Sequence, residues 1–449
     1  MSTTRKQIDA TPRFSTNPRV SQPMKLLVKP AEGIPDGEGF EVRVDYHGRP
    51  KAIVDADESL EGWVQACSEP GRCDGSFVVN EPIGAQSWFP CNNYMSDKAA
   101  FRTAITTASS RVALGAGELA SRKRHPNGTT TWTWIEHHPT ATYLTSATVG
   151  RFDLTRSSLT TPEGRTLPVY TAIDSAATGD QKRALRKLAG RISEITDFLT
   201  GTFGAYPFDS TGFVADWVPS VGYALENETK PHFAGSEKGP AISSTTLAHE
   251  LTHQWMGDSV SPATWHQIWF NEGWATISEV LFDRRVEHGK VSPEAFFRKV
   301  YASPDKSWRL APASLGDDPA NLFAGFPVYS RPGAMLEGLR EIVGEDRFGA
   351  LAKELGSRYG YATITEEQFV ATAEETSGLD DAGRAKLGDY LHQWLHDTTR
   401  PKLTPADFAG AQPSASRPTP GARRASMSER RNSGSSRLSP NSSRSLPIR

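Results

Sequence analysis

The hydrophobic pattern of the chain changes after Phe152. Before that point, apolar and polar residues alternate over Phe40–Tyr46 and Thr131–Ile135, and short apolar runs such as Thr142–Leu144 are separated by glycine and proline. Alternation points successive side chains to opposite faces of a strand, so these runs predict β-strands. Several short strands in succession are typical of a β-sandwich.

In the rest of the chain the apolar residues mostly recur every three to four positions, which indicates helices. A short strand around Leu167–Tyr170 comes first, and one long amphipathic helix is expected from Leu185 to Leu199. A helix over about residues 244–256, which Gly257 can end, is followed by a second helix beyond Pro262.

Three more helices are expected towards the C-terminal end. The second of them has a capping box, in which the side chains of Thr365 and Gln368 satisfy free backbone N–H groups. The last helix ends before Pro401, whose ring is incompatible with a helix interior. The apolar residues that define the three helices are Met335, Leu336, Leu339 and Ile342; Phe369 and Val370; and Leu387, Leu391, Trp394 and Leu395.

Length and composition indicate a soluble protein of more than one domain. The chain has 449 residues, of which 37% are hydrophobic and 23% charged. Its net charge of -2 does not indicate an acidic partner. The sequence has no apolar run long enough to span a bilayer and no apolar leader at its start, so we expect no membrane partner and, by default, a cytoplasmic location.

The last part of the chain, residues 408–449, is rich in Ser, Arg, Pro and Gly and poor in apolar residues. Such a composition cannot bury enough surface to offset the entropy of ordering, so this tail is expected to be disordered. Its basic charge is only a weak indication of nucleic-acid binding, and we expect no nucleic-acid partner.

The three cysteines do not make a disulfide framework. Cys67 and Cys73 flank a turn-rich segment, where they can pair in an oxidising compartment or remain reduced thiols in a loop. Cys91 has apolar neighbours and is expected to be a small buried hydrophobic residue.

The strongest chemical signal is an H-E-x-x-H sequence over His249–His253, followed by Glu272. Residues four apart share a helix face, so the two imidazoles point the same way. Two imidazoles and one carboxylate leave one tetrahedral position of a zinc ion open to water, as in catalytic sites. Glu250 can act as the general base on that water. We therefore expect one Zn²⁺ per chain, bound by His249, His253 and Glu272.

Other residues near this motif give weaker signals. Glu279 lies on a similar helix face to Glu272, where it can orient a ligand imidazole, although an exposed acid is the simpler interpretation. The remaining histidines have no companion at ligand spacing and are expected to be structural or solvated; they include His137, His138, His266, His392 and His396.

Further motifs lie in the order found in a known family. Val221–Asn227 ends in A-L-E-N and is similar to a G-x-M-E-N exopeptidase strand, Asn271–Ala275 reads N-E-G-W-A, and Val328–Arg331 is similar to a segment with a catalytic tyrosine. Asn80–Gln86 and Trp88–Cys91 resemble a substrate-facing stretch of a β domain. Together with the zinc motif, these segments resemble the aminopeptidase N type of zinc aminopeptidases, gluzincins that include leukotriene A4 hydrolase.

The resemblance covers about residues 20–405 and implies an α+β multidomain fold. A β-sandwich-like N-terminal domain is expected over 1–154, a thermolysin-like, mainly helical zinc domain over 155–407, and the disordered tail over 408–449. Members of the family usually have more β-domain residues before the point where this chain begins, so the N-terminal domain is expected to be truncated. Bacterial relatives are often secreted, which leaves the location open.

The resemblance also implies roles for residues around the metal. Glu226 and Glu81 would bind the free α-ammonium of a peptide, with Asn227 and Ala224 beside it, because a desolvated cation requires carboxylates aimed at it. Ordinary exposed acids are the alternative for both. Tyr329 would donate its phenolic O–H to the substrate carbonyl as negative charge develops there, and a core or surface tyrosine is the alternative.

Two departures from the family pattern affect the expected site. Tyr223 replaces a glycine, which is expected to narrow the cleft or to change the preference for side chains. Pro332 follows the tyrosine segment, where it is expected to shift Tyr329 slightly.

The function implied by the resemblance is zinc-dependent hydrolysis of N-terminal residues from peptides. A thermolysin-like endopeptidase is one alternative, and the pair Glu226–Asn227 argues against it. A non-catalytic peptide-binding relative is another, favoured by the shortened N-terminal domain and disfavoured by the intact Glu250. The side-chain preference and the oligomeric state have no readable pattern in the sequence.

Overall fold

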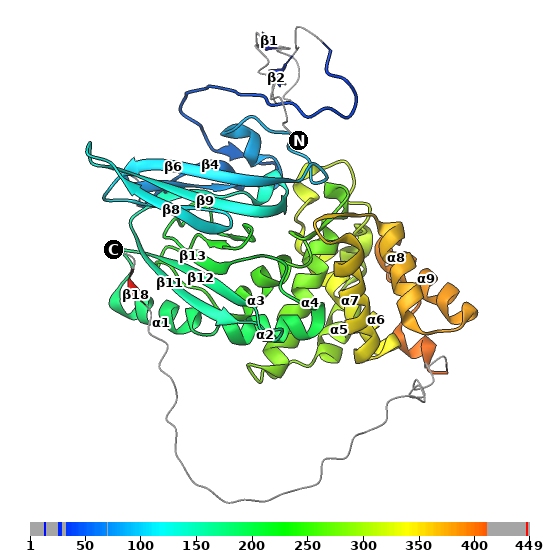
Figure 1. Ribbon diagram of the computed structural model, residues 1–449. Helices are drawn as coiled ribbons and strands as arrows, with labels where there is room; N and C mark the ends of the chain where they lie inside the picture. Colours follow the sequence, from blue (N-terminus) through cyan, green and yellow to red (C-terminus); the bar gives the residue numbers. More distant parts are fainter. Residues whose placement is uncertain (1–12, 15–25, 29–32, 70, 411–445, 448–449) are drawn as a thin grey trace, which may run out of the picture.

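The chain passes from a β-rich N-terminal part to a mainly helical C-terminal part, and the two lie side by side (Figure 1). The computed structural model describes residues 13–14, 26–28, 33–69, 71–410 and 446–447. The expected α+β fold class is confirmed. No helix of the described residues is both long and apolar enough to cross a lipid bilayer.

Two antiparallel sheets make up the N-terminal part. One has the strand order β3–β4–β5–β10–β7 and the other has the order β6–β9–β8. The strands of the first sheet are β3 (Ile53–Val54), β4 (Leu60–Glu69), β5 (Arg72–Val79), β10 (Ala147–Gly150) and β7 (Val112–Gly115). Those of the second are β6 (Ala99–Ala108), β9 (Thr129–Thr140) and β8 (Glu118–Arg124). The expected strand at Thr131–Ile135 lies within β9 and is confirmed.

Two other β predictions in this part are wrong. Phe40–Tyr46 forms no strand of its own, and Phe40 and Tyr46 are each 60% exposed. Alternation stabilises a strand only where one face is covered, and within this segment the structure has a single β-bridge, at Glu41, with the apolar residues on the surface. Thr142–Leu144 is a buried 3₁₀ turn, in which Leu144 N–H donates to the carbonyl of Ala141.

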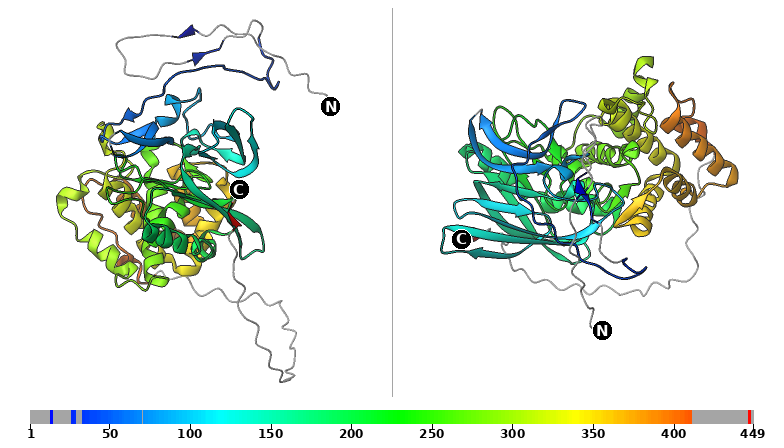
Figure 2. Two further views of the ribbon diagram at one scale, coloured as in Figure 1. Left: turned by 90° about the vertical axis from the view of Figure 1, so that its left-hand side faces the viewer. Right: turned by 90° about the horizontal axis from the view of Figure 1, so that it is seen from above.

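A mixed sheet joins the two parts of the molecule (Figure 2). Its order is β14–β15–β13–β12–β11–β18, with β12, β13 and β15 parallel to one another. The expected strand at Leu167–Tyr170 lies in β12 and is confirmed. The strands are β11 (Phe152–Thr160), β12 (Thr166–Asp174), β13 (Thr211–Ala215), β14 (Ala224–Leu225), β15 (His232–Phe233) and β18 (Leu446–Pro447). The expected boundary at residue 154 falls inside β11, and the division into domains stays a prediction.

The faces of this mixed sheet bury different clusters. On one side, Leu167 and Val169 pack in the large core with Leu185 and Ile195 of the first two helices. On the other side, Tyr170 meets Trp134 of β9 edge to face, with ring centroids 5.1 Å apart. Because β-strand side chains alternate, one strand serves both cores.

Nine α-helices lie among the described residues. The expected single helix over 185–199 is wrong, because the chain breaks at Gly190 into α1 and α2, and glycine is a poor helix former. The capping box of Thr365 and Gln368 at the start of α8 is present, and the last helix ends at His396, before Pro401. The helices are α1 (Gly179–Ala189), α2 (Ile192–Phe203), α3 (Ser244–His253), α4 (Trp269–Arg285), α5 (Pro293–Tyr301), α6 (Arg331–Val343), α7 (Glu345–Tyr359), α8 (Glu366–Ser377) and α9 (Asp381–His396).

Small elements and cysteines complete the fold. Two-stranded pairs are formed by β1 (Arg13–Phe14) with β2 (Leu26–Leu27), and by β16 (Val260–Pro262) with β17 (Ala362–Ile364). Cys67 and Cys73 form a disulfide, so the paired alternative is the one found. Cys91 was expected to be buried and is half-buried. Apart from residues 408–410 and 446–447, the expected disordered tail lies outside the described residues.

Candidate metal centre and substrate pocket

The metal motif begins on α3, whose first turn is fixed by a polar cap. The side chain of Ser243 accepts a hydrogen bond of 2.9 Å from the backbone N–H of Thr246. Leu247 and Leu251 are buried in the large core. The helix ends at His253, three residues before the expected end, because the backbone then turns through Gly257 at a φ of 139°.

Helix α4 delivers the third expected ligand. It packs against α3, and Glu272 lies in its first turn with only 5% of its side chain exposed. The Oε2 atom of Glu272 is 3.2 Å from His249 Nε2 and 3.6 Å from His253 Nε2. Two ligands about 2.05 Å from a tetrahedral zinc ion are about 3.3 Å apart, so this donor set fits zinc.

The second nitrogen of each imidazole also has a neighbour. His249 Nδ1 lies 3.4 Å from a carboxylate oxygen of Glu279, and His253 Nδ1 lies 3.3 Å from the carbonyl oxygen of Met256. Such partners fix the ring orientation and tautomer of metal-binding histidines. Glu279 is 40% exposed, and this contact favours the orienting role over that of a simple exposed acid.

Two groups of potential ligands occur among the described residues, and both lie here. One is His249, His253 and Glu272, and the other is Glu226, Glu250 and His253. The remaining histidines of the described chain belong to neither group. His138, for example, stacks on Tyr361 with ring centroids 4.8 Å apart, which is a structural role.

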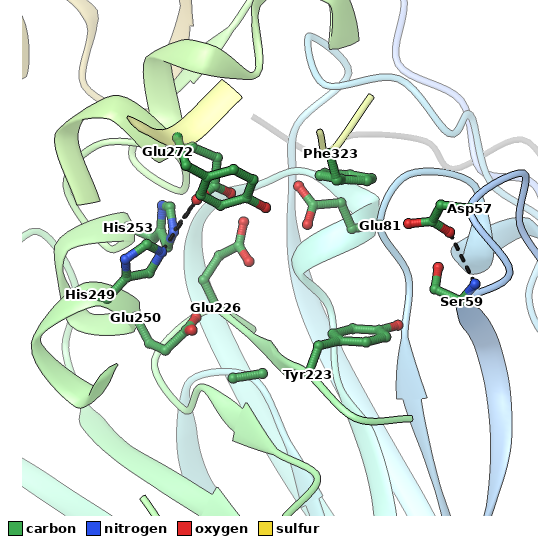
Figure 3. Close-up of a pocket in the computed structure, with 12 residues that line it drawn as sticks. Asp57, Ser59, Glu81, Tyr223, Glu226, His249, Glu250, His253, Glu272 and Phe323 are labelled. Atoms are coloured by element: carbon green, nitrogen blue, oxygen red, sulfur yellow. Dashed lines mark hydrogen bonds and ion pairs between the residues drawn. The ribbon is translucent and has the colours of Figure 1, made fainter. Parts of the chain in front are cut away.

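A pocket of about 290 Å³ opens beside these ligands (Figure 3). Its walls come from both parts of the molecule, because Asp57, Ser59 and Glu81 belong to the N-terminal part. The lining residues are Asp57, Ser59, Glu81, Tyr223, Ala224, Glu226, His249, Glu250, His253, Glu272, Phe323 and Tyr329. The pocket therefore contains every residue that we predicted for the site except Asn227.

Buried carboxyl groups face this pocket. Glu226 is 3% exposed and Glu250 is 6% exposed, and Figure 3 shows Glu81 and Glu226 directed into the same space. Among the described residues, Oε1 of Glu81 and Oε1 of Glu226 have no hydrogen-bond partner. Burial, and then the neighbouring carboxylates, raise the pKa of Glu81 and of Glu226 well above the usual value. A cation between these groups would relieve both effects.

Burial also tunes Glu250 and His253. The pKa of Glu250 rises to about 7, chiefly because burial disfavours the carboxylate. The pKa of His253 falls to about 4 because burial disfavours the imidazolium. A carboxyl that titrates near neutrality suits a general base, and a neutral imidazole has the free lone pair that a metal requires.

The two predicted ammonium-binding residues are held from behind by polar contacts. Asn80, which precedes Glu81, donates to the carbonyls of Tyr143 and Thr145 over 3.3 and 2.9 Å. The backbone carbonyl of Glu226 accepts a 3.1 Å hydrogen bond from Nε2 of Gln254, the residue that follows α3. Helix α3 and the segment that carries Glu226, directly after β14, are thus positioned relative to each other.

Three predicted residues differ in their position. Ala224 lines the pocket on β14, whereas Asn227 is buried behind it and donates to the carbonyl of Val78 over 3.4 Å. Tyr329 lines the pocket from a π-helical turn, Gly325–Ser330, an element common at functional sites. Burial, followed by the nearby carboxylates of which Glu272 has the largest effect, raises the pKa of Tyr329, so its O–H stays protonated and can donate.

Sequence reasoning missed Asp57, Ser59 and Phe323. These residues belong to no motif, and their place in the pocket follows from the packing of separate loops. In the sequence, the replacement of a family glycine by Tyr223 was the one signal for this region. The Tyr223 hydroxyl donates to the carbonyl of Leu60 over 2.6 Å and so connects the start of β4 to the pocket.

The β-rich and helical parts, with the metal-binding motif between them, are typical of a zinc metallopeptidase. Comparison with known proteins identifies the family. The family model described as "Peptidase family M1 domain" matches residues 233–394, and "Peptidase M1 N-terminal domain" matches residues 77–144. The chain belongs to the peptidase M1 family, which confirms the resemblance to aminopeptidase N-type proteins.

Named relatives cover most of this chain. It is 25% identical over 388 residues to Aminopeptidase M1-A of Oryza sativa subsp. japonica, covering 82% of this chain and 42% of the relative. It is 23% identical over 423 residues to Glutamyl aminopeptidase of Sus scrofa, covering 83% and 43% respectively. The chain thus spans about two fifths of the length of these curated relatives.

Solved structures share the fold. An M1 zinc metallopeptidase from Deinococcus radiodurans matches with a TM-score of 0.67 at 22% identity, covering 82% of this chain and 77% of the other. A mutant M1 zinc metallopeptidase from the same organism, bound to a Tyr-Ser-Ala substrate, matches with a TM-score of 0.71 at 21% identity, covering 88% and 86%.

Proposed function

We propose that the chain is a zinc-dependent aminopeptidase, which removes N-terminal residues from peptides and binds one Zn²⁺. The observation that carries the proposal is that Glu81 and Glu226, each with one buried oxygen that has no hydrogen-bond partner, line the same pocket as His249, His253 and Glu272. The names of the curated relatives, and a neighbour solved with a tripeptide substrate, support the same reaction class.

The proposed binding step explains why the substrate needs a free N-terminus. Glu226 and Glu81 accept hydrogen bonds from the α-ammonium, whose positive charge stabilises two carboxylates that burial otherwise disfavours. An internal amide offers one neutral N–H in place of three charged donors, so it cannot satisfy both groups. These contacts would fix the first peptide bond beside His249, His253 and Glu272.

The proposed hydrolysis divides the chemistry among a few groups. When bound, zinc would polarise the scissile carbonyl and lower the pKa of a water molecule. Glu250 accepts a proton from the attacking water and returns it to the departing amine, for which a pKa of about 7 is suited. Tyr329 donates its O–H to the carbonyl oxygen as negative charge grows there.

A pair of matched substrates tests this function. Zinc-loaded full-length protein should hydrolyse L-leucine p-nitroanilide, and the rate should fall to background with a chelator and recover with added zinc. The N-acetylated compound should not be cleaved, because it lacks the ammonium. Equal cleavage of the acetylated compound would support the endopeptidase alternative, and peptide binding without any turnover would support the non-catalytic one.

A further inference from the structure

One end of the pocket carries a carboxylate that the proposed reaction does not use. Glu250 and the ligand group account for the end near His249 and His253, and Glu81 with Glu226 accounts for the ammonium. Asp57 remains, at the end of the pocket away from the two histidines (Figure 3). Ser59, Tyr223 and Phe323 line the same end of the pocket. We call these three residues, together with Asp57, the side-chain slot.

The position of the slot follows from the two fixed points of the substrate. If the α-ammonium lies between Glu81 and Glu226 and the first carbonyl lies beside the histidines, the first side chain must leave the shared Cα in a third direction. Besides Ala224 and Tyr329, the lining residues that remain to contact this side chain are the four residues of the slot. Figure 3 shows the rings of Tyr223 and Phe323 on opposite sides of the pocket, with Asp57 beyond them.

The geometry points to a cationic side chain, and we propose that Asp57 makes this protein prefer peptides that begin with Arg or Lys. This inference rests on the proposed aminopeptidase function and names its substrate class. Aromatic faces attract a cation that passes between them, and a guanidinium stacks on them especially well. Asp57 is exposed, so it offers a carboxylate to the charged end of the side chain while that end keeps part of its water.

The charge of the whole pocket favours the same class. Five carboxylates line it: Asp57, Glu81, Glu226, Glu250 and Glu272. Among its described lining residues there is no lysine or arginine. Zinc would offset Glu272, and the α-ammonium would offset Glu81 and Glu226, so Asp57 is the carboxylate left to attract a cationic side chain and to repel an acidic one. Peptides beginning with Glu or Asp are therefore the poorest expected substrates.

The local structure keeps Asp57 in place. It lies in the turn between β3 and β4, where the backbone N–H of Ser59 donates to its Oδ1 over 3.0 Å, and that of Asp55 donates to the carbonyl of Ser59 over 2.9 Å. Tyr223 ties the beginning of β4 to the pocket through its hydrogen bond to Leu60. The replacement of a family glycine by Tyr223 thus supplies both a wall of the slot and its anchor.

The substitution Asp57→Asn isolates the charge, because the amide Oδ1 can still accept the hydrogen bond from Ser59. The matched control is Glu58→Gln, which removes the same charge from the neighbouring exposed residue, outside the pocket lining. Both variants and the unsubstituted chain are assayed with the p-nitroanilides of Arg, Lys, Leu and Glu.

We expect the unsubstituted chain to have a kcat/KM for Arg up to roughly fivefold above that for Leu, the size of effect that an exposed ion pair gives. Asp57→Asn should remove most of this ratio, and Glu58→Gln should leave it unchanged. The ratio should also fall when salt rises from about 0.05 to about 0.5 M, because salt screens exposed charges. No preference for Arg or Lys, or an equal loss in Glu58→Gln, overturns the proposal.

A binding measurement separates this proposal from the aminopeptidase function. Calorimetry with L-argininamide and L-leucinamide on the Glu250→Gln variant reports the slot without turnover. Argininamide should bind more tightly than leucinamide, and adding Asp57→Asn should abolish this difference. That result would support the slot even if no substrate were hydrolysed, and only the proposed function would then fail. Equal binding of the two amides overturns the slot, while hydrolysis of leucine p-nitroanilide leaves the aminopeptidase function standing.

Discussion

At the scale of single residues, burial sets the proton affinity of a carboxyl group beside the metal ligands. Glu250 lies next to His249, and its raised pKa of about 7 makes it a base that can both take and return a proton near neutrality. Glu250→Gln keeps the shape but removes the proton acceptor. We expect turnover to fall by roughly 10²–10⁴-fold with zinc content unchanged, measured by steady-state kinetics and metal analysis. Turnover within a fewfold of the original would refute the role.

Tyr329 is predicted to act by donating one hydrogen bond to the carbonyl oxygen. The variant Tyr329→Phe removes only the hydroxyl, so kcat should fall by roughly 10²–10³-fold, as when an oxyanion donor is lost. Zinc content and the thermal midpoint should change little, which distinguishes a lost donor from a damaged site. An unchanged kcat would return Tyr329 to a purely structural role.

Glu61 links stability to pH. Its side chain is fully buried, its Oε2 accepts from the backbone N–H of Ile83 over 2.9 Å, and burial raises its pKa to about 7. The folded state therefore binds this proton more tightly than the unfolded state, so the residue reduces stability increasingly as pH rises from about 4.5 to about 7. Glu61→Gln should be more stable than the original by about 2–3 kcal/mol at pH 8 and nearly equal at pH 4.5.

Urea unfolding of the two proteins at several pH values measures that difference. The gap should open between pH 4.5 and pH 7 and then stay constant. A gap independent of pH would mean that Glu61 is not the group that titrates.

At the scale of secondary-structure elements, Arg331 joins two helices. It begins α6, is fully buried, and donates hydrogen bonds to carbonyls at the end of α9, including those of Trp394 at 2.7 Å and Asp397 at 2.8 Å. Lysine has one nitrogen and cannot reproduce this fork. Arg331→Lys should lower the free energy of unfolding by about 2–4 kcal/mol, whereas the exposed Arg309→Lys should change it by less than about 0.5 kcal/mol. Denaturant titration compares them.

The sequence predicted an element well where the element depends only on residues close to it in the chain. The H-E-x-x-H helix and the capping box at Thr365 depend on neighbours within one turn, and both are present. The break between α1 and α2 was missed because the apolar period continues across Gly190. The strand expected at Phe40–Tyr46 did not form because a strand needs a covered face, which alternation does not report, and Phe40 and Tyr46 are exposed.

At the scale of the whole molecule, the pocket is assembled from segments far apart in the sequence. Spacing on two helices was enough to predict His249, His253 and Glu272, and the family resemblance added Glu81, Glu226 and Tyr329. Asp57 and Phe323 could not be predicted, because their position depends on how the N-terminal sheet packs on the helical part. Side-chain preference is accordingly a property of the assembled molecule.

A crystal structure of the zinc-loaded chain, with anomalous scattering recorded at the zinc edge, tests the metal site directly. We predict one strong peak per chain, about 2.0–2.2 Å from His249 Nε2, His253 Nε2 and a carboxylate oxygen of Glu272. A peak elsewhere, or no peak at a saturating zinc concentration, would contradict the metal site and with it the proposed peptidase function.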